Sequence, residues 1–337
     1  MSDARLVFER NPVWRQETDP IRRQAWDRAE VVVGSAEPEV ISGHLAAGSA
    51  DLPWGVLLPQ EGVPIGGSET GYALDPYLAF NVIGPRADEV LGRRQIRRAL
   101  AGAIDREGVA ELAARVDPGW TAHPAWSIVP TGNDGHHVRE RPPVAAPGES
   151  GRTLAEAGWT GEHKLIAVCP AVPPYPEITR SCAQDLARIG VSVVVTELPL
   201  DEYRELLDDP ARAREGAWDL ACTSWSPSWC HDNARVFLQP LFQSSDWRGT
   251  ANCGQYGTPR VDGLINDALN TVDPRESAAR WGALEQEPIE DCAIVLLLFR
   301  SPKGASRRSS RLRDAIALPA SGHAVDLVNV RPADVEA

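Results

Sequence analysis

The residues best suited to chemistry lie in one short stretch, residues 225–233, which reads Trp-Ser-Pro-Ser-Trp-Cys-His-Asp-Asn. Cys230, His231 and Asp232 are neighbours within it. A carboxylate that is desolvated between indole rings has a raised pKa, so Asp232 could act as a general acid or base near neutral pH. Adjacent side chains of a loop seldom converge on one atom. A loop that only binds a ligand, or an Asp232 that caps a helix, explains the same residues, and these interpretations are open.

The rest of the sequence offers few other reactive patterns. It has no GxSxG elbow, no HExxH pair and no CxxC spacing, which are the usual signs of a serine hydrolase, a zinc peptidase and a structural zinc site. His136 and His137 are adjacent, but no acid or cysteine stands at a supporting spacing. The glycine-rich stretch 66–71 lacks the lysine of a phosphate-binding loop. We therefore expect no metal and no cofactor.

The reactive stretch follows a predicted buried strand. Residues 218–225 are mainly apolar and are bounded by Gly216 and Pro227, which suits a strand better than a helix. Pro227 has no amide proton to give to a sheet, so we expect the chain to leave the sheet there. Asn233 can then cap a helix that continues through Phe237. In an open α/β sheet, ligands usually bind at the loops that leave the carboxyl ends of the strands.

A strand-helix-strand pattern precedes this strand. It consists of a strand at 164–169, a helix at 177–189 that Gly190 ends, and a strand at 191–198. Such a unit implies parallel strands and a right-handed crossover. The other predicted elements are a strand at 28–33, a helix at 37–47, a strand at 74–83, a helical segment at 89–116, helices at 201–207, 260–270 and 274–287, and strands at 293–299 and 324–330.

The helical segment 89–116 carries two further features. Asp105 is placed to cap its second part. Its arginines lie on the face opposite the apolar residues, and they are predicted to form either a solvated face or a surface that recognises an acidic partner. They are Arg93, Arg94, Arg97 and Arg98. The segment 118–151 is rich in Pro, Gly and His without a helical or strand period, so we expect an irregular crossing there.

Seven segments of the chain follow one another in the order of a known family. They are residues 8–14, 77–81, 94–106, 155–159, 185–191, 218–242 and 256–262. They resemble the family 5 bacterial extracellular solute-binding proteins, the oligopeptide, dipeptide and nickel receptors of ABC importers. The first resembles the Arg-Asn-Pro-x-Trp/Tyr box of that family, and the third its Arg-Gln-Ala-Leu-x-x-Ala-Ile-Asp-Arg signature. The resemblance implies an α/β, periplasmic-binding-protein-like fold of type II, with two lobes around a ligand cleft.

The resemblance also implies how the chain divides. Lobe I is expected to comprise residues 1–120 and 300–337, and lobe II residues 121–299. Lobe I is expected to be incomplete, because members of the family have further strands before the Arg-Asn-Pro box, which begins here at Arg10. An exposed sheet edge would remain, so a partner chain or self-association is expected to cover it.

The binding loop of the family predicts a set of ligand-contacting residues. In peptide-binding members, a Trp-x-x-Asp loop supplies the carboxylate that meets the amino group of the ligand. Counted from Trp225, that position is Ser228, and the nearest acid is Asp232. We expect a small-molecule or peptide-like ligand. The residues predicted to bind it are Tyr77, Asn81, Trp225, Ser228, Trp229, Asp232, Asn233 and Tyr256.

Composition limits the partners and the location. The chain has 47 acidic and 34 basic residues and a formal net charge of -13, which repels phosphate backbones, so we expect no nucleic-acid partner. No apolar run approaches the ~20 residues that a membrane span needs. The first residues lack the pattern of an export signal. The sequence as given therefore predicts a cytoplasmic location, whereas the family that it resembles works outside the cell.

Two functions are open at this point. In the first, the chain is a solute-binding module in which Trp225 and Trp229 supply apolar area, and Asp232 with Asn81 fixes the orientation of the ligand. In the second, it is a cytoplasmic biosynthetic enzyme derived from this fold. That enzyme would condense or cyclise an aromatic amino acid derivative, for example in a Pictet-Spengler-type step, with Asp232 and His231 as catalytic residues. A third, structural reading is a fragment that is stable only with its partner.

Overall fold

The computed structural model describes most of the chain as two compact units. Unit 1 consists of Met1–Thr70 and Pro302–Ala337, and unit 2 of Gly71–Ser301. The described residues are 4–20, 25–34, 37–54, 58, 63–64, 73–131, 133, 135–137, 147–226, 234–245, 247–303, 307–318, 324–326 and 330–333. The lobe boundary between residues 120 and 121 stays a prediction.

Unit 2 is built on a mixed sheet. Its described strands follow the order β5-β10-β4-β8-β6-β7, and β9 also pairs with β4. β6 lies between β7 and β8 and is parallel to both, whereas β4 is antiparallel to β8, β9 and β10. The strands are β4 (Ala73–Phe80), β5 (Trp120–Pro124), β6 (Lys164–Pro170), β7 (Ser192–Leu198), β8 (Leu220–Trp225), β9 (Ile294–Leu296) and β10 (Leu298–Pro302).

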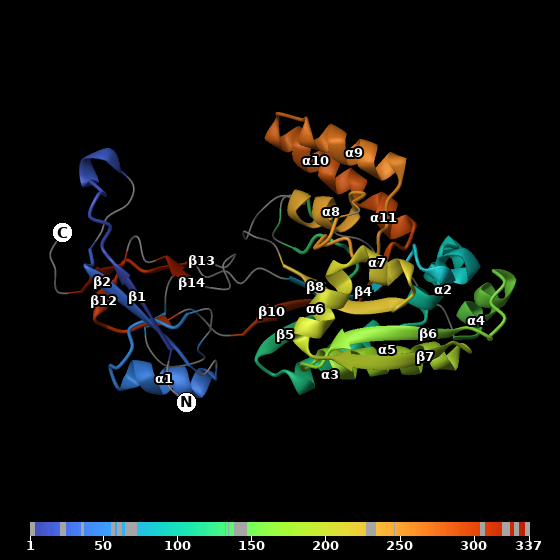
Figure 1. Ribbon diagram of the computed structural model, residues 1–337, viewed down its shortest axis with the longest axis horizontal. Helices are drawn as coiled ribbons and strands as arrows, with labels where there is room; N and C mark the ends of the chain where they lie inside the picture. The colour runs from blue at the N-terminus through green and yellow to red at the C-terminus, as the bar shows by residue number, and fades with distance from the viewer. Residues whose placement is uncertain are drawn as a thin grey trace. The chain divides into compact units, whose positions relative to one another are not determined.

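Helices cover both faces of this sheet. The helices of unit 2 are η2 (Ala87–Leu91), α2 (Arg94–Gly102), α3 (Arg106–Val116), α4 (Pro147–Glu156), α5 (Tyr175–Arg188), α6 (Leu200–Asp208), α7 (Pro210–Arg214), α8 (Arg235–Phe242), α9 (Pro259–Leu269), α10 (Pro274–Leu284) and α11 (Gln286–Glu290). Figure 1 shows α5 on one side of the sheet and α8 to α10 on the other. Leu165 and Cys169 of β6 belong to the core on the α5 side, while Val168 belongs to the opposite core. The central strands are therefore buried on both faces.

The predicted strand-helix-strand units are confirmed. β6, α5 and β7 form one parallel unit, and Gly190 follows α5 with φ +82°, a left-handed conformation that glycine adopts without strain. The predicted strand at 218–225 is β8, which begins two residues later and pairs parallel with the other edge of β6. The carboxyl ends of β6 and β8 therefore lie side by side.

A bulge in β4 changes which way its side chains point. The register with β8 shifts between Leu74 and Tyr77, and Pro76 in that interval has no amide proton for the ladder. Strict alternation would place Leu74 on the same face as Leu78, yet it packs in the core that contains Tyr77. The bulge thus re-aims the side chains of β4 beside the end of β8.

The helical segment predicted at 89–116 is divided into η2, α2 and α3. Asp105 caps α3 as predicted, because its carboxylate accepts a hydrogen bond from the amide of Gly108 at 3.1 Å. The expected solvated arginine face is wrong for Arg97, which is 6% exposed. Its guanidinium donates to the carbonyls of Leu91, Asp291 and Cys292. Arg97 ties α2 to the turn after α11 and is not a surface for a partner.

The sequence predicts no regular element between 118 and 151, but the structure has β5 and the start of α4 there. β5 joins the sheet beside β10. The Thr121 hydroxyl donates to the carbonyl of Ser301 at 3.0 Å, and the Ala125 amide donates to the carbonyl of Leu297. β5 is short and only partly buried, so its sequence carries little alternation for a pattern to detect.

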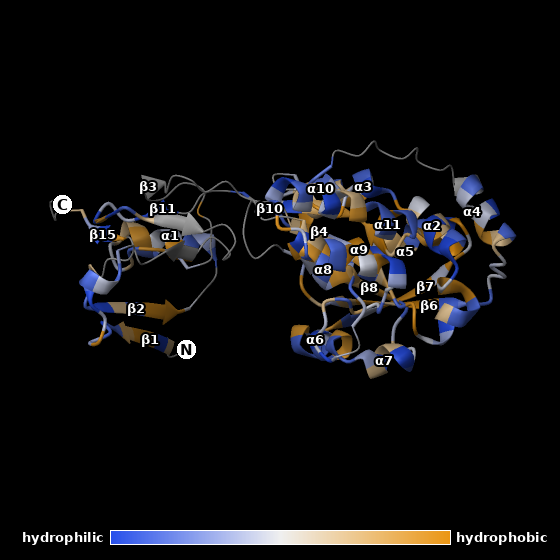
Figure 2. Ribbon diagram, turned by 90° about the horizontal axis from the view of Figure 1, so that it is seen from above, coloured by the Kyte–Doolittle hydropathy of each residue, from blue (hydrophilic) through white to orange (hydrophobic). Residues whose placement is uncertain are grey.

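The described residues of unit 1 form small pieces of sheet and one longer helix. Its described core cluster contains Leu312 and Val330, with Trp26, Leu52 and Ala315 packed against it. The antiparallel pair β1 and β2 is largely exposed and carries apolar stretches beside charged residues; Figure 2 shows the apolar stretches in orange. The described elements of unit 1 are β1 (Ala4–Glu9), η1 (Gln16–Thr18), β2 (Arg28–Val33), α1 (Pro38–Ala46), β3 (Val63–Pro64), β11 (Arg307–Arg308), β12 (Leu312–Arg313), β13 (Ile316–Leu318), β14 (Ala324–Asp326) and β15 (Arg331–Pro332).

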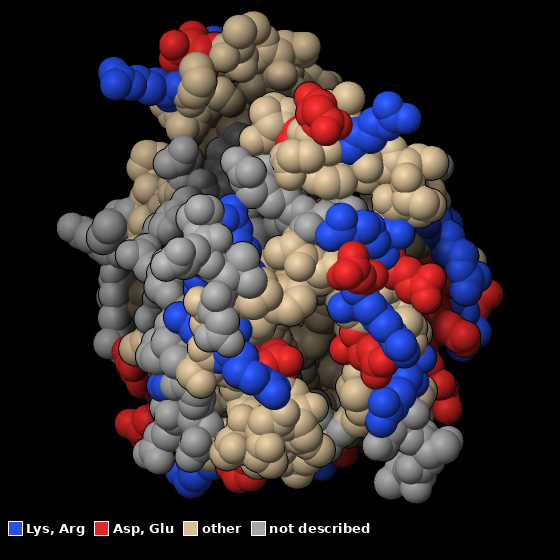
Figure 3. Space-filling view, turned by 90° about the vertical axis from the view of Figure 1, so that its left-hand side faces the viewer, with Lys and Arg blue, Asp and Glu red and all other residues tan. Residues whose placement is uncertain are grey.

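Charged side chains of both signs are interleaved on the face drawn in Figure 3. The overall excess is acidic, with a formal net charge of -13. Among the described helices, none has both the length and the apolar content for crossing a lipid bilayer.

Candidate functional site

A pocket of about 500 Å³ opens at the carboxyl ends of β6 and β8. This volume lies within the range of sites that hold small organic ligands. The position is the one where ligands bind to open α/β sheets, because parallel strand ends and the loops that follow them meet there. The residues that line it are Tyr77, Pro170, Val172, Tyr175, Leu200, Tyr203, Arg204, Leu207, Asp208, Thr223, Ser224, Trp225, Thr250, Ala251 and Cys253.

Aromatic side chains form much of the lining and are held by specific contacts. The Trp225 indole Nε1 donates to the carbonyl of Val236 in α8 at 2.6 Å, which fixes one edge of the ring. The Tyr203 hydroxyl donates to the carbonyl of Cys222 at 2.8 Å and attaches α6 to β8. Trp225 is partly exposed, so its ring remains available to a ligand. Rigid rings of this kind present apolar area at a small cost in side-chain entropy.

One wall of the pocket leads into a chain of polar side chains. The Tyr175 hydroxyl lies 2.8 Å from Asp75 Oδ1 and 3.3 Å from Ser224 Oγ. The other carboxylate oxygen of Asp75 accepts a hydrogen bond from Arg300 at 3.2 Å. Arg300 also pairs with Asp117, and its guanidinium lies 4.9 Å from the centre of the Trp120 ring. The chain therefore runs from the pocket surface to an arginine that is only 3% exposed.

Burial controls the protonation of Asp75 and Tyr175 in this row of polar side chains. Desolvation raises the pKa of Asp75, while the nearby Arg300 and the hydrogen bond from Tyr175 lower it. Desolvation and the neighbouring Asp75 raise the pKa of the Tyr175 hydroxyl above its usual value. Tyr175 therefore keeps its proton at any physiological pH. It acts as a hydrogen-bond donor to Asp75 and is not a phenolate nucleophile.

The chemistry of the pocket favours binding. The lining combines four aromatic rings with the hydroxyls of Thr223, Ser224 and Thr250, and its charged members are Arg204 and Asp208 of α6, both exposed. Within the part of the chain that the structure describes, no group of three or more His, Cys, Asp and Glu side chains could hold a metal ion. Apolar surface with a few oriented polar groups suits an amphipathic ligand.

The structure brings together two of the predicted ligand-binding residues. Tyr77 and Trp225 both line the pocket. They come from neighbouring strands, since Tyr77 pairs with Thr223 across the β4 and β8 ladder. Four predicted ligand contacts and the second catalytic candidate lie outside the described residues, so their roles stay predictions, and so does the enzyme that depends on them. These are Ser228, Trp229, Asp232 and Asn233, with His231.

Asn81 is placed away from the pocket and is fully used within the fold. It is 2% exposed. Its Nδ2 group donates to the carbonyls of Ala213 and Trp218, both at 2.8 Å. Its Oδ1 atom accepts from the amides of Ile83 and Gly84. All the hydrogen-bonding groups of this side chain are engaged, so in the structure Asn81 joins the end of β4 to the turn before β8.

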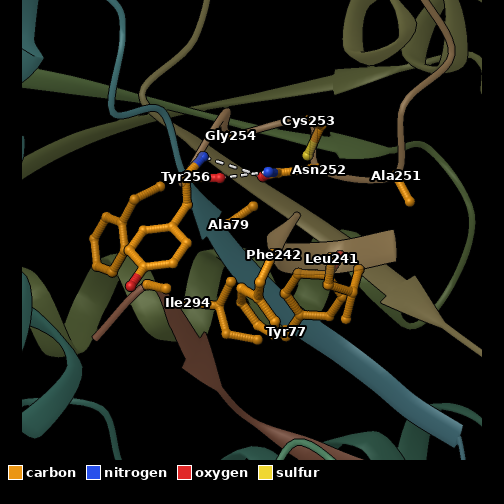
Figure 4. Close-up of a pocket in the computed structure, with 12 residues that line it drawn as sticks. Tyr77, Ala79, Leu241, Phe242, Ala251, Asn252, Cys253, Gly254, Tyr256 and Ile294 are labelled. Carbon is orange, nitrogen blue, oxygen red and sulfur yellow. Dashed lines mark hydrogen bonds between the residues drawn. The ribbon is translucent and has the colours of Figure 1, made fainter. Parts of the chain in front are cut away.

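Tyr256 lies beside a small void under the sheet, and its place in ligand binding stays a prediction. Figure 4 shows Tyr256 with Tyr77 and Phe242 around this void, and the dashed lines mark hydrogen bonds between Asn252 and Tyr256. The void holds about 10 Å³, which is room for no more than one water molecule. The Tyr256 hydroxyl donates to Asp291 at 2.9 Å, and its ring meets Phe242 edge to face. These contacts secure the chain after α8.

The sequence interpretation misses three residues of the polar chain, which are Asp75, Tyr175 and Arg300. Arg300 stands 225 positions after Asp75, and no local pattern connects them. One signal was present. An Asp-Pro pair inside an otherwise apolar strand is unusual, and a proline there indicates a bulge or an edge. Bulges occur often beside functional sites.

Comparison with known proteins gives a consistent result. The model of the bacterial extracellular solute-binding proteins, family 5 Middle, matches residues 2–249. The chain is 24% identical over 327 residues to the periplasmic oligopeptide-binding protein OppA of Salmonella typhimurium, which covers 88% of this chain and 53% of OppA. It is 26% identical over 187 residues to the nickel-binding protein NikA of Staphylococcus aureus, covering 54% of this chain and 35% of NikA. The chain thus spans about half the length of OppA and about a third of the length of NikA.

Solved structures share the fold. A protein described as clavulanic acid biosynthesis oligopeptide binding protein 2 superposes with a TM-score of 0.78 at 24% identity, over 98% of this chain and 61% of that protein. A dipeptide binding protein from Pseudoalteromonas, solved in complex with Met-Leu, superposes with a TM-score of 0.68 at 19% identity, over 98% of this chain and 62% of that protein. These structures confirm the predicted α/β class and the type II periplasmic-binding-protein-like fold.

Proposed function

Because the chain belongs to the family 5 bacterial extracellular solute-binding proteins, we propose that it captures a small amphipathic or peptide-like ligand in the pocket at the carboxyl ends of β6 and β8. The observation that carries this proposal is the placement of Trp225, with Tyr77 and Tyr203, around a space of about 500 Å³ at those strand ends. Three rings around one opening bury the apolar part of such a ligand.

The loop that follows β8 begins at this pocket, because Trp225 lines it. The sequence of that loop contains the spacing Trp-x-x-Asp at Trp229 and Asp232. Counting from Trp229 in place of Trp225 turns the apparent loss of the family carboxylate at Ser228 into a displacement of four residues. We therefore propose that Asp232 supplies the charged contact for the ligand, and that the other predicted loop residues surround it.

The experiment is a binding measurement on the full chain. An equimolar mixture of dipeptides that includes Met-Leu is presented to the protein, retained compounds are identified by native mass spectrometry, and their dissociation constants are measured by calorimetry. Trp225→Ala is expected to weaken binding by about tenfold or more, because the substitution removes an aromatic contact surface at the pocket. The control is Trp247→Ala, the same truncation at a tryptophan that is 61% exposed and does not line the pocket.

Equal affinity of the wild type and Trp225→Ala for a retained dipeptide would show that the pocket is not the binding site. If no dipeptide is retained, a dipeptide ligand is excluded. Asp232→Asn refines the same measurement. A binding role predicts weaker affinity for dipeptides with a free amino terminus, and an unchanged affinity contradicts the assignment of Asp232.

A partner for unit 1 is a separate proposal. Leu6 and Phe8 of β1 are each 53% exposed, and Val32 and Val33 of β2 are each 51% exposed. Such an apolar strand pair is a template for further pairing. We propose that another polypeptide covers this strand pair. In the isolated protein, a second copy of the chain is proposed to cover it by self-association. Light scattering on a sizing column should show an oligomer that Phe8→Asp disrupts, whereas a monomer at about 100 μM contradicts the proposal.

Location is a further proposal. The family description places its members outside the cell, whereas the described cysteines are all free and buried. They are Cys169, Cys182, Cys222, Cys253 and Cys292. Free thiols suit a reducing compartment, and on that ground we propose a cytoplasmic location. Fractionation of the source cells, followed by detection of the chain with an antibody, tests this, and recovery from the extracytoplasmic fraction contradicts it.

A further inference from the structure

The polar chain behind the pocket wall has a defined direction. Arg300 carries only donors, and it donates to Asp75. In its ionised form, which Arg300 stabilises, the Asp75 carboxylate has no hydrogen to give, so the 2.8 Å contact must use the single hydrogen of the Tyr175 hydroxyl. The direction is therefore fixed at the buried end by the guanidinium.

The consequence reaches the pocket surface. The Tyr175 and Ser224 hydroxyls are 3.3 Å apart, and either could donate to the other if both were free. The hydrogen of Tyr175 is committed to Asp75, so a hydrogen bond across this 3.3 Å contact needs the Ser224 hydroxyl as its donor. What remains at the surface of the pocket is the Ser224 oxygen with its lone pairs. Both Tyr175 and Ser224 line the pocket, so a ligand there meets an acceptor.

The charges of these polar side chains also favour a ligand that carries a hydrogen-bond donor. One guanidinium, that of Arg300, faces two carboxylates, Asp75 and Asp117. This partly buried group therefore has an excess of one negative charge when both carboxylates are ionised. The charged side chains that line the pocket itself, Arg204 and Asp208, are of opposite sign and exposed. A positive group in the pocket is thus attracted, and a carboxylate is repelled.

We infer that Ser224, oriented through Tyr175 and Asp75 by Arg300, is a specificity-determining contact that selects ligands carrying a hydrogen-bond donor, and an ammonium group above all. Ser224 touches the ligand, whereas the other three are positioning residues. This inference rests on the proposed function. It deepens that function by naming the ligand chemistry, and it locates the contact in described residues outside the loop of Asp232.

The test uses three probes that share a phenylethyl body and differ in the polar end. These probes are 2-phenylethylamine, which donates and is cationic, 2-phenylethyl methyl ether, which only accepts, and 3-phenylpropionate, which accepts and is anionic. Each is titrated against the full chain by ligand-observed NMR at neutral pH. We expect the amine to bind about tenfold more tightly than the ether, the size of one charge-assisted hydrogen bond, and the anion to bind more weakly than either.

Variants separate a selective contact from simple packing. Ser224→Ala removes the acceptor, and Tyr175→Phe removes the group that orients it, so both are expected to reduce the ratio of amine to ether affinity to about threefold or less. Tyr203→Phe is the matched comparison. It deletes a hydroxyl from the same pocket, but that hydroxyl donates to the Cys222 carbonyl and not to the chain. Tyr203→Phe should change the affinity for all three probes by the same factor, so the ratio of amine to ether affinity should stay at its wild-type value.

Several results would overturn the inference. Equal binding of the amine and the ether by the wild type shows that the pocket captures ligands without selecting donors, which leaves the proposed function standing. A ratio that survives Ser224→Ala and Tyr175→Phe assigns the selection to other groups. If no probe binds at about 10 mM, the inference fails, and the dipeptide measurement decides separately whether the pocket binds any ligand.

Discussion

Replacing Arg300 with methionine is expected to destabilise unit 2 strongly. Methionine keeps much of the side-chain volume but removes the guanidinium from between Asp75 and Asp117. Arg300 is 3% exposed, and Asp75 is 8% exposed. The substitution therefore leaves a buried carboxylate that has lost its charged partner and keeps the hydrogen bond from the Tyr175 hydroxyl.

The expected magnitude follows from the contacts. Removing one partner of a buried ion pair costs about 3–5 kcal/mol. Loss of the contact with the Trp120 ring adds to this cost, while the bond from Tyr175 and proton uptake by Asp75 reduce it. We expect about 3 kcal/mol at neutral pH. For a unit of this size 1 kcal/mol corresponds to about 2–4 °C, so the melting temperature should fall by about 6–12 °C. Arg300→Met combined with Asp75→Asn removes both charges and should recover about half of the loss.

The pH dependence has a definite sign. Burial raises the pKa of Asp75 in the folded state above its ordinary value of 3.8, and Arg300 opposes that rise. The folded state therefore binds the proton more tightly than the unfolded state, and ionisation of Asp75 costs stability as the pH rises through the interval between the two pKa values. Without Arg300 the folded pKa rises further. The difference in stability between wild type and Arg300→Met should thus shrink as the pH falls.

Thermal unfolding followed by near-ultraviolet circular dichroism, at about pH 7 and about pH 5, measures both effects. Arg260→Met is the control, because Arg260 forms an exposed pair with Glu287 and should leave the melting temperature unchanged. A loss in Arg300→Met that is small, or equal at the two pH values, would refute the reasoning. The same conclusion would follow if the double variant were no more stable than the single one.

Further substitutions test single features of the fold through urea unfolding at constant m value. Asn81→Ala should cost about 3 kcal/mol, because it leaves two buried carbonyls and two amides without their partner, and a loss below about 1 kcal/mol would contradict the structural role. Asp105→Ala should cost about 1 kcal/mol as the lost cap of α3; an unchanged midpoint would show that the cap is dispensable. Leu238 is fully buried in α8, so Leu238→Ala should cost about 2–5 kcal/mol of unfolding free energy. Val272 is 95% exposed, so Val272→Thr should leave the unfolding free energy unchanged. A larger loss for Val272→Thr than for Leu238→Ala would contradict the assigned burial.

Much of the fold could be predicted from local pattern. The strands and helix of the β6, α5 and β7 unit follow from short apolar runs, a 3.6-residue period and a glycine at the helix end. The sequence also located the strand that leads to the pocket and the cap of α3. It did not find β5, whose residues are only partly buried. Nor did it find the break between η2 and α2, because the apolar period continues through it.

The site was less accessible to sequence reasoning. The place of Trp225 at the end of a strand is a local property, and a pattern can show it. The partners of Asn81 are the carbonyls of Ala213 and Trp218, more than 130 positions away, so a polar side chain that completes the fold looked the same as one that binds a ligand. The chain from Arg300 to Tyr175 is also a product of tertiary structure, since it joins β10 to β4 and α5.

The central claim is that ligands bind at the carboxyl ends of β6 and β8, and amide chemical shifts of the full chain test it most directly. 2-Phenylethylamine or a retained dipeptide is titrated into isotopically labelled protein. The account predicts that the perturbed amides cluster in four segments, namely residues 170–175, 200–208, 223–226 and 250–253. Saturable shifts confined to other parts of the chain, with these four segments unmoved, would contradict it.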